Sequence, residues 1–339
     1  MTTDVAKGLA RHQRRLVEEA ESLGLAREQL LEAGGLTEAE LADPDARIPT
    51  IKRWRLWSYI SAQVKDPDLG LRIGSTLVVR QFGLVGYTML HSRTLFQAFG
   101  RMVRYGRILS DLASDLALEK VEGGWGLTNL RGVDAFRHLR QPVDETFAAI
   151  VAIARQITGE DIAPLRVDFP YQRPASVEAL RSYFRSDLRF GALVGSIVIR
   201  DRDMKLPLIG ADEDLTGYLD QLAGQKLEEL SREETFIGRV RRAIWQSLSD
   251  GQTTLSGVAS ELFMSPRTLQ RRLNEEEVSF TELVDSMRRE MAPILLEDRQ
   301  MAVYEVAYLL GYGEPSTFFR AFRRWHGQSP REYREQIAV

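Results

Sequence analysis

The sequence predicts an α+β N-terminal domain, mostly helical with a small sheet, followed by an all-α C-terminal domain. Apolar residues recur at three- and four-residue steps through much of the first 210 residues, but alternate on both sides of Gly123-Gly124, as in a β-hairpin. From residue 235 onward no segment alternates, and the apolar pattern is helical. A length of 339 residues is typical of two domains.

The first domain, residues 1–210, is expected to begin with helices and to continue into the sheet. Residues 1–80 are predicted to be helical, with Thr50 capping a helix through about Lys65. A second helical stretch is expected from Gly83 to Asp111. The remaining elements are about four strands and three helices, the last of them in a linker over residues 211–234: strands Leu116–Val121, Gly126–Leu130, Leu165–Phe169 and Ser196–Ile199, and helices Asp144–Ile157, Ser176–Phe184 and Asp212–Ser231.

Composition excludes several kinds of site. The chain has no cysteine, which rules out disulfides, thiolate zinc sites, iron–sulfur clusters and a cysteine nucleophile. The four histidines are scattered, and neither a P-loop nor a Gly-x-Ser-x-Gly elbow occurs, so we expect no metal, no cofactor, no catalytic residue and no enzyme activity. The longest apolar run, Phe147–Ala154, is far shorter than the ~20 residues that span a bilayer, and the start does not resemble a secretion signal. A cytoplasmic protein is expected.

The last hundred residues contain a degenerate internal repeat. The pattern Pro-x-Thr-[Leu/Phe]-x-Arg-x-[Leu/Phe] begins at Pro266 and recurs 49 residues later at Pro315. A Val-Ala pair precedes each copy, at Val258 and at Val306. Each copy predicts a short helix, a tight turn and a second helix with Pro at its first position. Residues 235–339 are therefore expected to contain two helix-turn-helix units.

In a helix-turn-helix, the second helix enters the major groove of double-stranded DNA with its N-terminal half. Leu269, Leu273, Phe318 and Phe322 are expected in the core. The predicted DNA-binding residues lie on the outward face: Arg267, Thr268, Gln270, Arg271, Ser316, Thr317, Phe319, Arg320 and Arg323. Arg pairs with guanine, Gln with adenine, and an exposed Phe packs on a thymine methyl. The alternative is a pair of helical hairpins whose Arg side chains are merely solvated, and two copies in register argue against it.

These residues resemble the AraC/XylS family of bacterial transcription regulators. The resemblance is carried by Ala307-Tyr-Leu-Leu-Gly-Tyr312, Phe322-Arg-Arg-Trp-His-Gly327 and Ser329-Pro-Arg-Glu-Tyr-Arg334. Residues 1–210 are similar to the arabinose-binding-type sensor domain of one branch, through Phe82-Gly-Leu-Val-Gly-Tyr87 and Thr94-Leu-Phe-Gln-Ala-Phe99. The resemblance implies a homodimeric regulator with the sensor first and the DNA-binding domain last. Its implied partners are double-stranded DNA, a small-molecule effector and RNA polymerase.

Three residues depart from the family pattern. Phe263 and Glu277 stand where glycine is usual. Pro293 lies inside the helix expected from Glu282 to Leu296, which joins the two helix-turn-helix units. A proline inside a helix costs about 3 kcal/mol unless the helix kinks. We expect Pro293 to affect the angle between the two units.

The resemblance also implies an effector pocket in residues 1–210. The expected lining residues are mostly aromatic: Phe82, Tyr87, His91, Arg104, Tyr105 and Trp125. Arg104 lies at the border of the apolar stripe of its helix, so we expect it to meet an anionic group on a ligand with an apolar body, near Trp125. The alternative is a surface ion pair between Arg104 and an acid such as Asp111, worth under ~1 kcal/mol.

Two other functions remain open at this stage. The chain could be an interaction protein, or a regulator whose sensor domain only dimerises and binds no ligand. A sensor interior without polar groups would favour this reading. Residues 1–210 could instead be an enzyme fused to a DNA-binding domain, which a pocket with paired carboxylates would favour. The sequence names neither the effector nor the operator, and it does not separate activation from repression.

Overall fold

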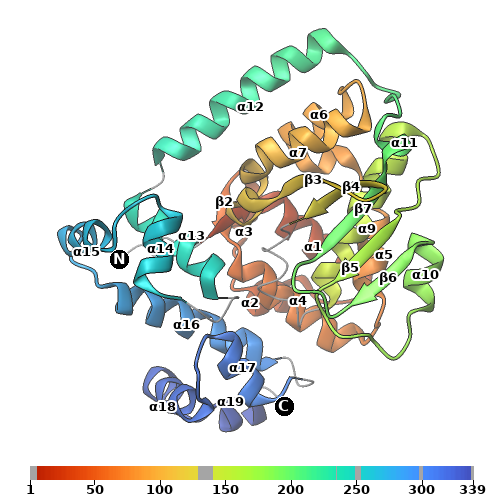
Figure 1. The fold of residues 1–339 in the computed structure, drawn as a ribbon. Helices are drawn as coiled ribbons and strands as arrows, with labels where there is room; N and C mark the ends of the chain where they lie inside the picture. The colour runs from red at the N-terminus through yellow and green to blue at the C-terminus, as the bar shows by residue number, and fades with distance from the viewer. Residues whose placement is uncertain (1–5, 129–139, 234, 249–252, 298–300, 337–339) are drawn as a thin grey trace. The chain divides into compact units, whose positions relative to one another are not determined.

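The structure is a computed structural model that describes residues 6–128, 140–233, 235–248, 253–297 and 301–336. Its contacts divide the chain into two units, one of residues 7–233 and one containing residues 234–339. Figure 1 traces the elements of both. The first unit combines helices with a small sheet and the described part of the second is helical, so the predicted fold class is confirmed.

Helices make up most of the first unit. They are α1 (Ala10–Ser22), α2 (Arg27–Gly34), α3 (Glu38–Ala42), α4 (Ile51–Val64), α5 (Leu69–Ser75), α6 (Gly83–Leu90), α7 (Leu95–Leu109), α9 (Arg140–Thr158), α10 (Glu178–Phe184), α11 (Asp201–Met204) and α12 (Glu213–Glu233), with 3-10 helices η1 (Val79–Phe82) and η2 (Asp111–Asp115). The stretch predicted as one helix from Gly83 is two, because the hydroxyl of Thr94 accepts a hydrogen bond from the backbone N–H of Gln97 and starts α7. Helix α4 begins where predicted, but Thr50 makes no side-chain cap.

The main sheet has five strands among the described residues, in the order β3-β4-β7-β5-β6. They are β3 (Ala117–Val121), β4 (Gly124–Thr128), β5 (Arg166–Phe169), β6 (Asp187–Phe190) and β7 (Ser196–Arg200). The predicted hairpin is confirmed, and Gly123 supplies the positive φ of 77° at its turn. Residues 129 and 130 of the predicted second strand lie outside the described residues.

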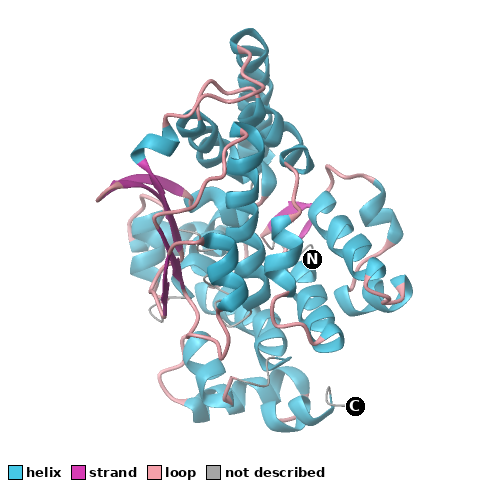
Figure 2. Cartoon of the chain, turned by 90° about the vertical axis from the view of Figure 1, so that its right-hand side faces the viewer, coloured by secondary structure: helices cyan, strands magenta, loops and turns pink. Residues whose placement is uncertain are grey.

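Three strands were not predicted. Strand β6 pairs in parallel with β5 at the sheet edge. Its charged residues Asp187 and Arg189 are exposed, so its sequence lacks the apolar run by which a strand is recognised. The three-residue strands β1 (Lys7–Leu9) and β2 (Arg47–Pro49) form a separate antiparallel pair. Figure 2 shows this short pair apart from the main sheet.

Two apolar clusters fill the first unit. One joins α1–α5 around buried residues such as Leu16 and Trp57, and the other joins the sheet to α7 and α9 around Phe147 and Phe169. Helices α5 and α9 lie unusually close. A Cβ at Gly70 would stand 2.0 Å from the carbonyl oxygen of Gln141, so only glycine fits at this crossing.

Helix α12, predicted within the linker, packs against α6 and α7 and groups with the first unit. Ala223 is fully buried on its inner face. Arg101 of α7 forms an ion pair with Asp220 of α12 at 2.8 Å, and the hydroxyl of Tyr105 donates to the carbonyl of Asp220 at 3.3 Å. These contacts hold α12 along α7.

The second unit consists of short helices around one long helix. They are α13 (Phe236–Leu248), α14 (Leu255–Glu261), α15 (Pro266–Glu275), α16 (Phe280–Glu297), α17 (Val303–Leu309), α18 (Pro315–His326) and α19 (Pro330–Gln336). Helix α16 contacts α13, α17, α18 and α19, and it contains Pro293 as predicted. A proline at 293 has no N–H to bond to the carbonyl of Arg289, and His326 of α18 donates a hydrogen bond to that carbonyl.

Candidate nucleic-acid interface and effector cavity

The first helix-turn-helix unit consists of α14 and α15. Val258 and Ala259 of α14 are fully buried, as are Leu269 and Leu273 of α15, which confirms their predicted inward direction. Ala259 has no bulk beyond Cβ, so the two helices can cross closely. The hydroxyl of Ser265 accepts a hydrogen bond from the N–H of Thr268 at 3.1 Å and caps α15.

The second helix-turn-helix unit consists of α17 and α18 and repeats this arrangement. Ala307, Phe318 and Phe322 are fully buried. Arg288 of α16 fixes the end of α17, because its Nε donates to the carbonyl of Leu310 at 2.7 Å and its Nη2 to that of Gly311 at 3.0 Å. The residue that precedes Pro315, Glu314, makes no side-chain cap.

Both turns close with the same backbone hydrogen bonds. The N–H of Met264 donates to the carbonyl of Ala259 at 2.8 Å, and the N–H of Tyr312 donates to that of Ala307 at 3.0 Å. This closure needs a left-handed residue, which is Phe263 with φ 55° in one turn and Gly311 with φ 73° in the other. Glu277, which follows the C-cap residue of α15, has φ 56°. The sequence positions where glycine is usual are therefore left-handed backbone positions.

The predicted DNA-binding residues lie on the outer sides of α15 and α18. Those that are exposed are Arg267, Arg271, Ser316, Thr317, Arg320 and Arg323, and those half-buried are Thr268, Gln270 and Phe319. Arg271 forms an exposed ion pair with Glu275 at 2.8 Å. Within the described part of the chain, no ion pair involves Arg267 or Arg320. Both helices thus present guanidinium groups to solvent.

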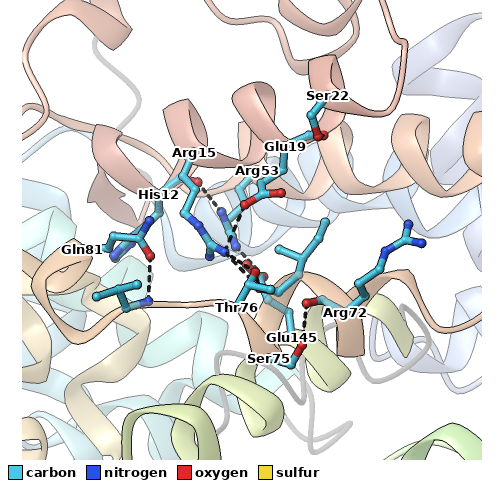
Figure 3. Close-up of polar contacts among 12 residues, drawn as sticks. His12, Arg15, Glu19, Ser22, Arg53, Arg72, Ser75, Thr76, Gln81 and Glu145 are labelled. Atoms are coloured by element: carbon cyan, nitrogen blue, oxygen red, sulfur yellow. Dashed lines mark hydrogen bonds and ion pairs between the residues drawn. The ribbon is translucent and has the colours of Figure 1, made fainter. Parts of the chain in front are cut away.

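The N-terminal unit, residues 7–233, contains a cavity of about 470 Å³, a volume in the range of small-molecule sites. Helices α1, α4, α7 and α9 supply most of its lining. Apolar side chains cover much of it, and the polar lining groups gather on α1 and α4 (Figure 3). The lining residues include Arg11, His12, Gln13, Arg15, Thr50, Arg53, Phe82, Met102, Glu145, Ile150 and Ile153.

Arg53 and Glu145 join α4 to α9 at the cavity. Arg53 forms an ion pair with the buried carboxylate of Glu145, and its Nη1 donates to the carbonyl of His12 at 2.7 Å. Arg15 donates to the carbonyl of Ile73 at 2.9 Å and forms an ion pair with Glu19 at 3.3 Å (Figure 3). The cavity wall is thus a network of charged groups that links three helices and the end of α5.

Two family profiles match this chain. The arabinose-binding domain of AraC transcription regulators, N-terminal, matches residues 24–208, and a helix-turn-helix domain matches residues 258–336. The chain belongs to the AraC family of transcription regulators. The resemblance seen in the sequence is therefore confirmed, and the family's relatives are regulators rather than enzymes.

Named relatives span most of the chain. The ornithine utilization regulator of Pseudomonas aeruginosa is 28% identical over 312 residues, covering 92% of this chain and 91% of that protein. The transcriptional regulator VirS of Mycobacterium tuberculosis is 27% identical over 289 residues, covering 83% and 82%. The crystal structure of the regulator CdpR from Pseudomonas aeruginosa covers 91% of this chain and 96% of its own, at 22% identity and a TM-score of 0.42.

The six residues predicted to bind an effector are not brought together. Only Phe82 lines the cavity. His91 donates to the carbonyl of Gly210 at 2.8 Å, and Trp125 packs against Phe96 and Lys120. Tyr87 is 42% exposed.

Arg104 does not take the place expected of it. It is exposed on α7 and lies 5.2 Å from the centre of the Tyr105 ring, while the neighbouring Arg101 and Arg107 contact α12. Arg107, rather than Arg104, approaches Asp111, at 3.9 Å. The cavity lies elsewhere because α12 covers this side of α7.

The cavity residues of α1 were missed, although the sequence carried a signal. Ala10, Leu16, Val17 and Ala20 form the buried stripe of α1, and Gln13 occupies the same stripe with only 2% exposure. A polar side chain on an apolar stripe must find a buried partner or line a polar cavity.

No described group of three or more His, Asp or Glu could hold a metal ion, and no described helix is long and apolar enough to cross a membrane.

Proposed function

We propose that this AraC-family regulator binds specific DNA sites through α15 and α18 and responds to a small-molecule effector bound in its first unit. The observation that supports the effector is the 470 Å³ cavity, whose polar wall lies in a unit distinct from both helix-turn-helix units. Residues 1–210 would sense the effector and dimerise, residues 211–234, whose helix α12 packs on that domain, would link and share in dimerisation, and residues 235–339 would bind DNA. RNA polymerase as a partner and a cytoplasmic location belong to the same proposal and rest on the family alone.

The DNA-binding part of the proposal rests on the outward guanidinium groups. Two recognition helices on one chain would read successive major-groove faces about 34 Å apart. Arg271 and Arg320 occupy matched positions in the two copies and are exposed. A gel-shift titration over a salt series tests this, because arginine–phosphate contacts release counterions and affinity should fall steeply with salt. A flat response between low and physiological salt would contradict DNA binding through these groups.

The effector would act by a population shift. A ligand that binds one arrangement of the dimer more tightly than another changes DNA affinity by the ratio of those affinities. The test measures operator affinity with and without each compound that stabilises the protein in a thermal-shift screen. Ornithine belongs in that screen because a relative is an ornithine utilization regulator. A stabilising compound that leaves operator affinity unchanged argues against effector control.

Dimerisation has its own structural support. Leu215, Tyr218 and Leu222 of α12 are 38%, 71% and 53% exposed and follow one another at helical spacing on its outer face. An exposed apolar stripe of this kind suits self-association with a second copy of the chain. This observation also favours the alternative, in which the first unit only dimerises.

Light scattering tests the assembly. We expect the full chain to be a dimer, the fragment 235–339 to be a monomer, and Tyr218→Glu to weaken the dimer. A monomeric full chain with a dimeric fragment would place the interface in the second unit instead.

A further inference from the structure

Five buried polar atoms on the cavity wall have no hydrogen-bond partner among the described residues. They belong to neighbouring positions of α1 and to the residue before α4: Nε of Arg11, Nε2 of His12, Oε1 of Gln13, Nε of Arg15 and Oγ1 of Thr50. Gln13 and Thr50 are 2% and 7% exposed, so their side chains do not reach bulk water. A buried polar atom that is left unpaired destabilises the folded protein, because its hydration is lost and not replaced. Five around one cavity indicate a wall that is completed by a polar ligand.

The partners of the three arginines show which of them a ligand can use. Arg53 bonds through Nη1 to the carbonyl of His12 and through Nη2 to Glu145, and none of its nitrogens is buried without a partner. Arg11 directs Nη2 to Asp45, a carboxylate that is 68% exposed, while its own Nε stays buried. Arg15 uses Nη2 toward Ile73 and Glu19, and its Nε is likewise unpaired. Two cavity-lining arginines therefore each keep one buried guanidinium N–H without a partner.

The surroundings favour an acceptor that carries negative charge. Burial and then the charges of Arg53, Arg11 and Arg15 lower the pKa of the buried His12 to about 3, so its ring is neutral at pH 7. A positive potential that keeps a histidine neutral also attracts an anion. A guanidinium N–H bonds most strongly to an ionised oxygen, and a carboxylate can accept from two such groups at once.

The rest of the wall is apolar. Phe82, Met102, Ile150 and Ile153 line the cavity from η1, α7 and α9, with Leu77 and Leu109 beside them. The ring of Phe82 also packs edge-on against His12, at 5.7 Å between centres, so apolar and polar walls meet there. A purely charged molecule would leave this surface unused.

We infer that the cavity takes a small carboxylate-bearing effector, its carboxylate held by the guanidinium groups of Arg11 and Arg15 and its apolar body packed against Phe82, Met102 and Ile150. This inference rests on the proposed effector control and names the ligand's chemical class. It moves the anion-binding arginine from α7 to α1. His12, Gln13 and Thr50 supply the further hydrogen-bonding groups around the carboxylate end.

The experiment uses the full-length protein and matched pairs of probes. Hexanoate, octanoate, phenylacetate and leucine are each compared with the corresponding primary amide by thermal shift, and arabinose serves as a neutral polar probe. We expect at least one carboxylate to stabilise the protein and its amide to have no effect. Calorimetric titration then gives the Kd of that carboxylate in the variants Arg11→Met and Arg15→Met, and in Arg104→Met as the matched control.

The Kd should rise about tenfold or more in Arg11→Met and in Arg15→Met, because each loses one charged hydrogen bond, and stay unchanged in Arg104→Met. Two variants are needed because Arg15 also bonds to the carbonyl of Ile73, so that Arg15→Met can disturb the fold itself. If Arg15→Met does not fold, Arg11→Met still tests the inference. Stabilisation by amides or arabinose as strong as by carboxylates overturns the carboxylate inference but leaves effector control intact. Loss of binding in Arg104→Met overturns the location. If no carboxylate probe stabilises the protein, the carboxylate inference is wrong. If compounds stabilise the protein but none changes its operator affinity, the proposed effector control is wrong.

Discussion

The first helix-turn-helix unit buries two leucines, Leu269 and Leu273, where the second buries the rings of Phe318 and Phe322. The first has a serine cap at Ser265 and the second has none. Their turns differ in length: the first helices of the two units start 48 residues apart, at Leu255 and Val303, and the second helices 49 apart, at Pro266 and Pro315. The comparison teaches that one backbone plan, closed by the same hydrogen bonds, is stabilised by different interactions in each copy.

The largest expected difference is in the cores. Phe322→Ala should lower the free energy of unfolding by about 3–5 kcal/mol, because its ring packs against Phe318, His326 and Tyr333 at centre distances of 5.7, 4.5 and 5.5 Å. Leu273→Ala removes a smaller side chain and should cost less, about 2–3 kcal/mol. Urea unfolding followed by fluorescence measures both. Equal losses would mean that the aromatic cluster adds no stability to the second helix-turn-helix unit.

DNA binding should also differ between the copies. Arg320→Ala should weaken operator binding by about 1–3 kcal/mol and relax base preference at one position. Arg271→Ala should cost less, because Arg271 has to leave its ion pair with Glu275 to reach DNA. Gel-shift titrations with base-substituted operators measure both effects, and each variant should lower the salt slope by about one.

Arg324→Ala is the matched control for these titrations. This arginine is exposed like Arg320, but it pairs with Asp285 of α16 at 2.8 Å. Its replacement should leave base preference unchanged. Wild-type affinity for both Arg271→Ala and Arg320→Ala would refute the proposed DNA contacts.

The N-caps provide a smaller test. Ser265→Ala should lower the free energy of unfolding by about 1 kcal/mol, because the N–H of Thr268 loses its acceptor. Glu314→Ser introduces a cap at the start of α18, where there is none, and should stabilise the second helix-turn-helix unit by a similar amount. Thermal unfolding of the two variants gives both signs, and a neutral Glu314→Ser would show that α18 starts without need of a cap.

The left-handed residues of the two turns provide the test with the smallest expected effect. Phe263 is 99% exposed and left-handed, so Phe263→Gly removes backbone strain without loss of packing and should raise stability by about 0.5–1 kcal/mol. Gly311→Ala should lower it by about 1 kcal/mol for the converse reason. The thermal midpoints of the two variants should move in opposite directions. A destabilising Phe263→Gly would indicate that the Phe263 ring has a contact of its own.

Local patterns in the sequence could predict the second unit well. Helical spacing and a matched repeat placed Leu269 and Phe322 inside and Arg271 and Arg320 outside, because helix direction follows from neighbours three and four residues away. Even the left-handed positions at Phe263 and Glu277 were marked by the missing glycines. The DNA contacts themselves remain a prediction.

The cavity could not be predicted in this way. His12, Arg53 and Glu145 come from three helices and meet only through tertiary packing, so no single sequence window contains them. The apolar stripe of α7 by itself favours Arg104, whereas α12, more than a hundred residues later, packs against that helix. Thr50 was expected to cap a helix, but it lines the cavity and its buried hydroxyl has no hydrogen-bond partner.

Helix α16 carries a consequence for the operators this protein can tolerate. Pro293 leaves the helix one backbone hydrogen bond short, and His326 ties α18 to the carbonyl thus freed. About 20 Å of helix precedes the proline, at ~1.5 Å per residue. A bend of about 10° at Pro293 therefore displaces the start of α16 by about 3.4 Å, the rise of one base pair. Insertion or deletion of one base pair also turns one recognition sequence by about 35° relative to the other, so this joint can offset only the change in length. The affinity lost on such a change should therefore be larger in a Pro293→Ala variant.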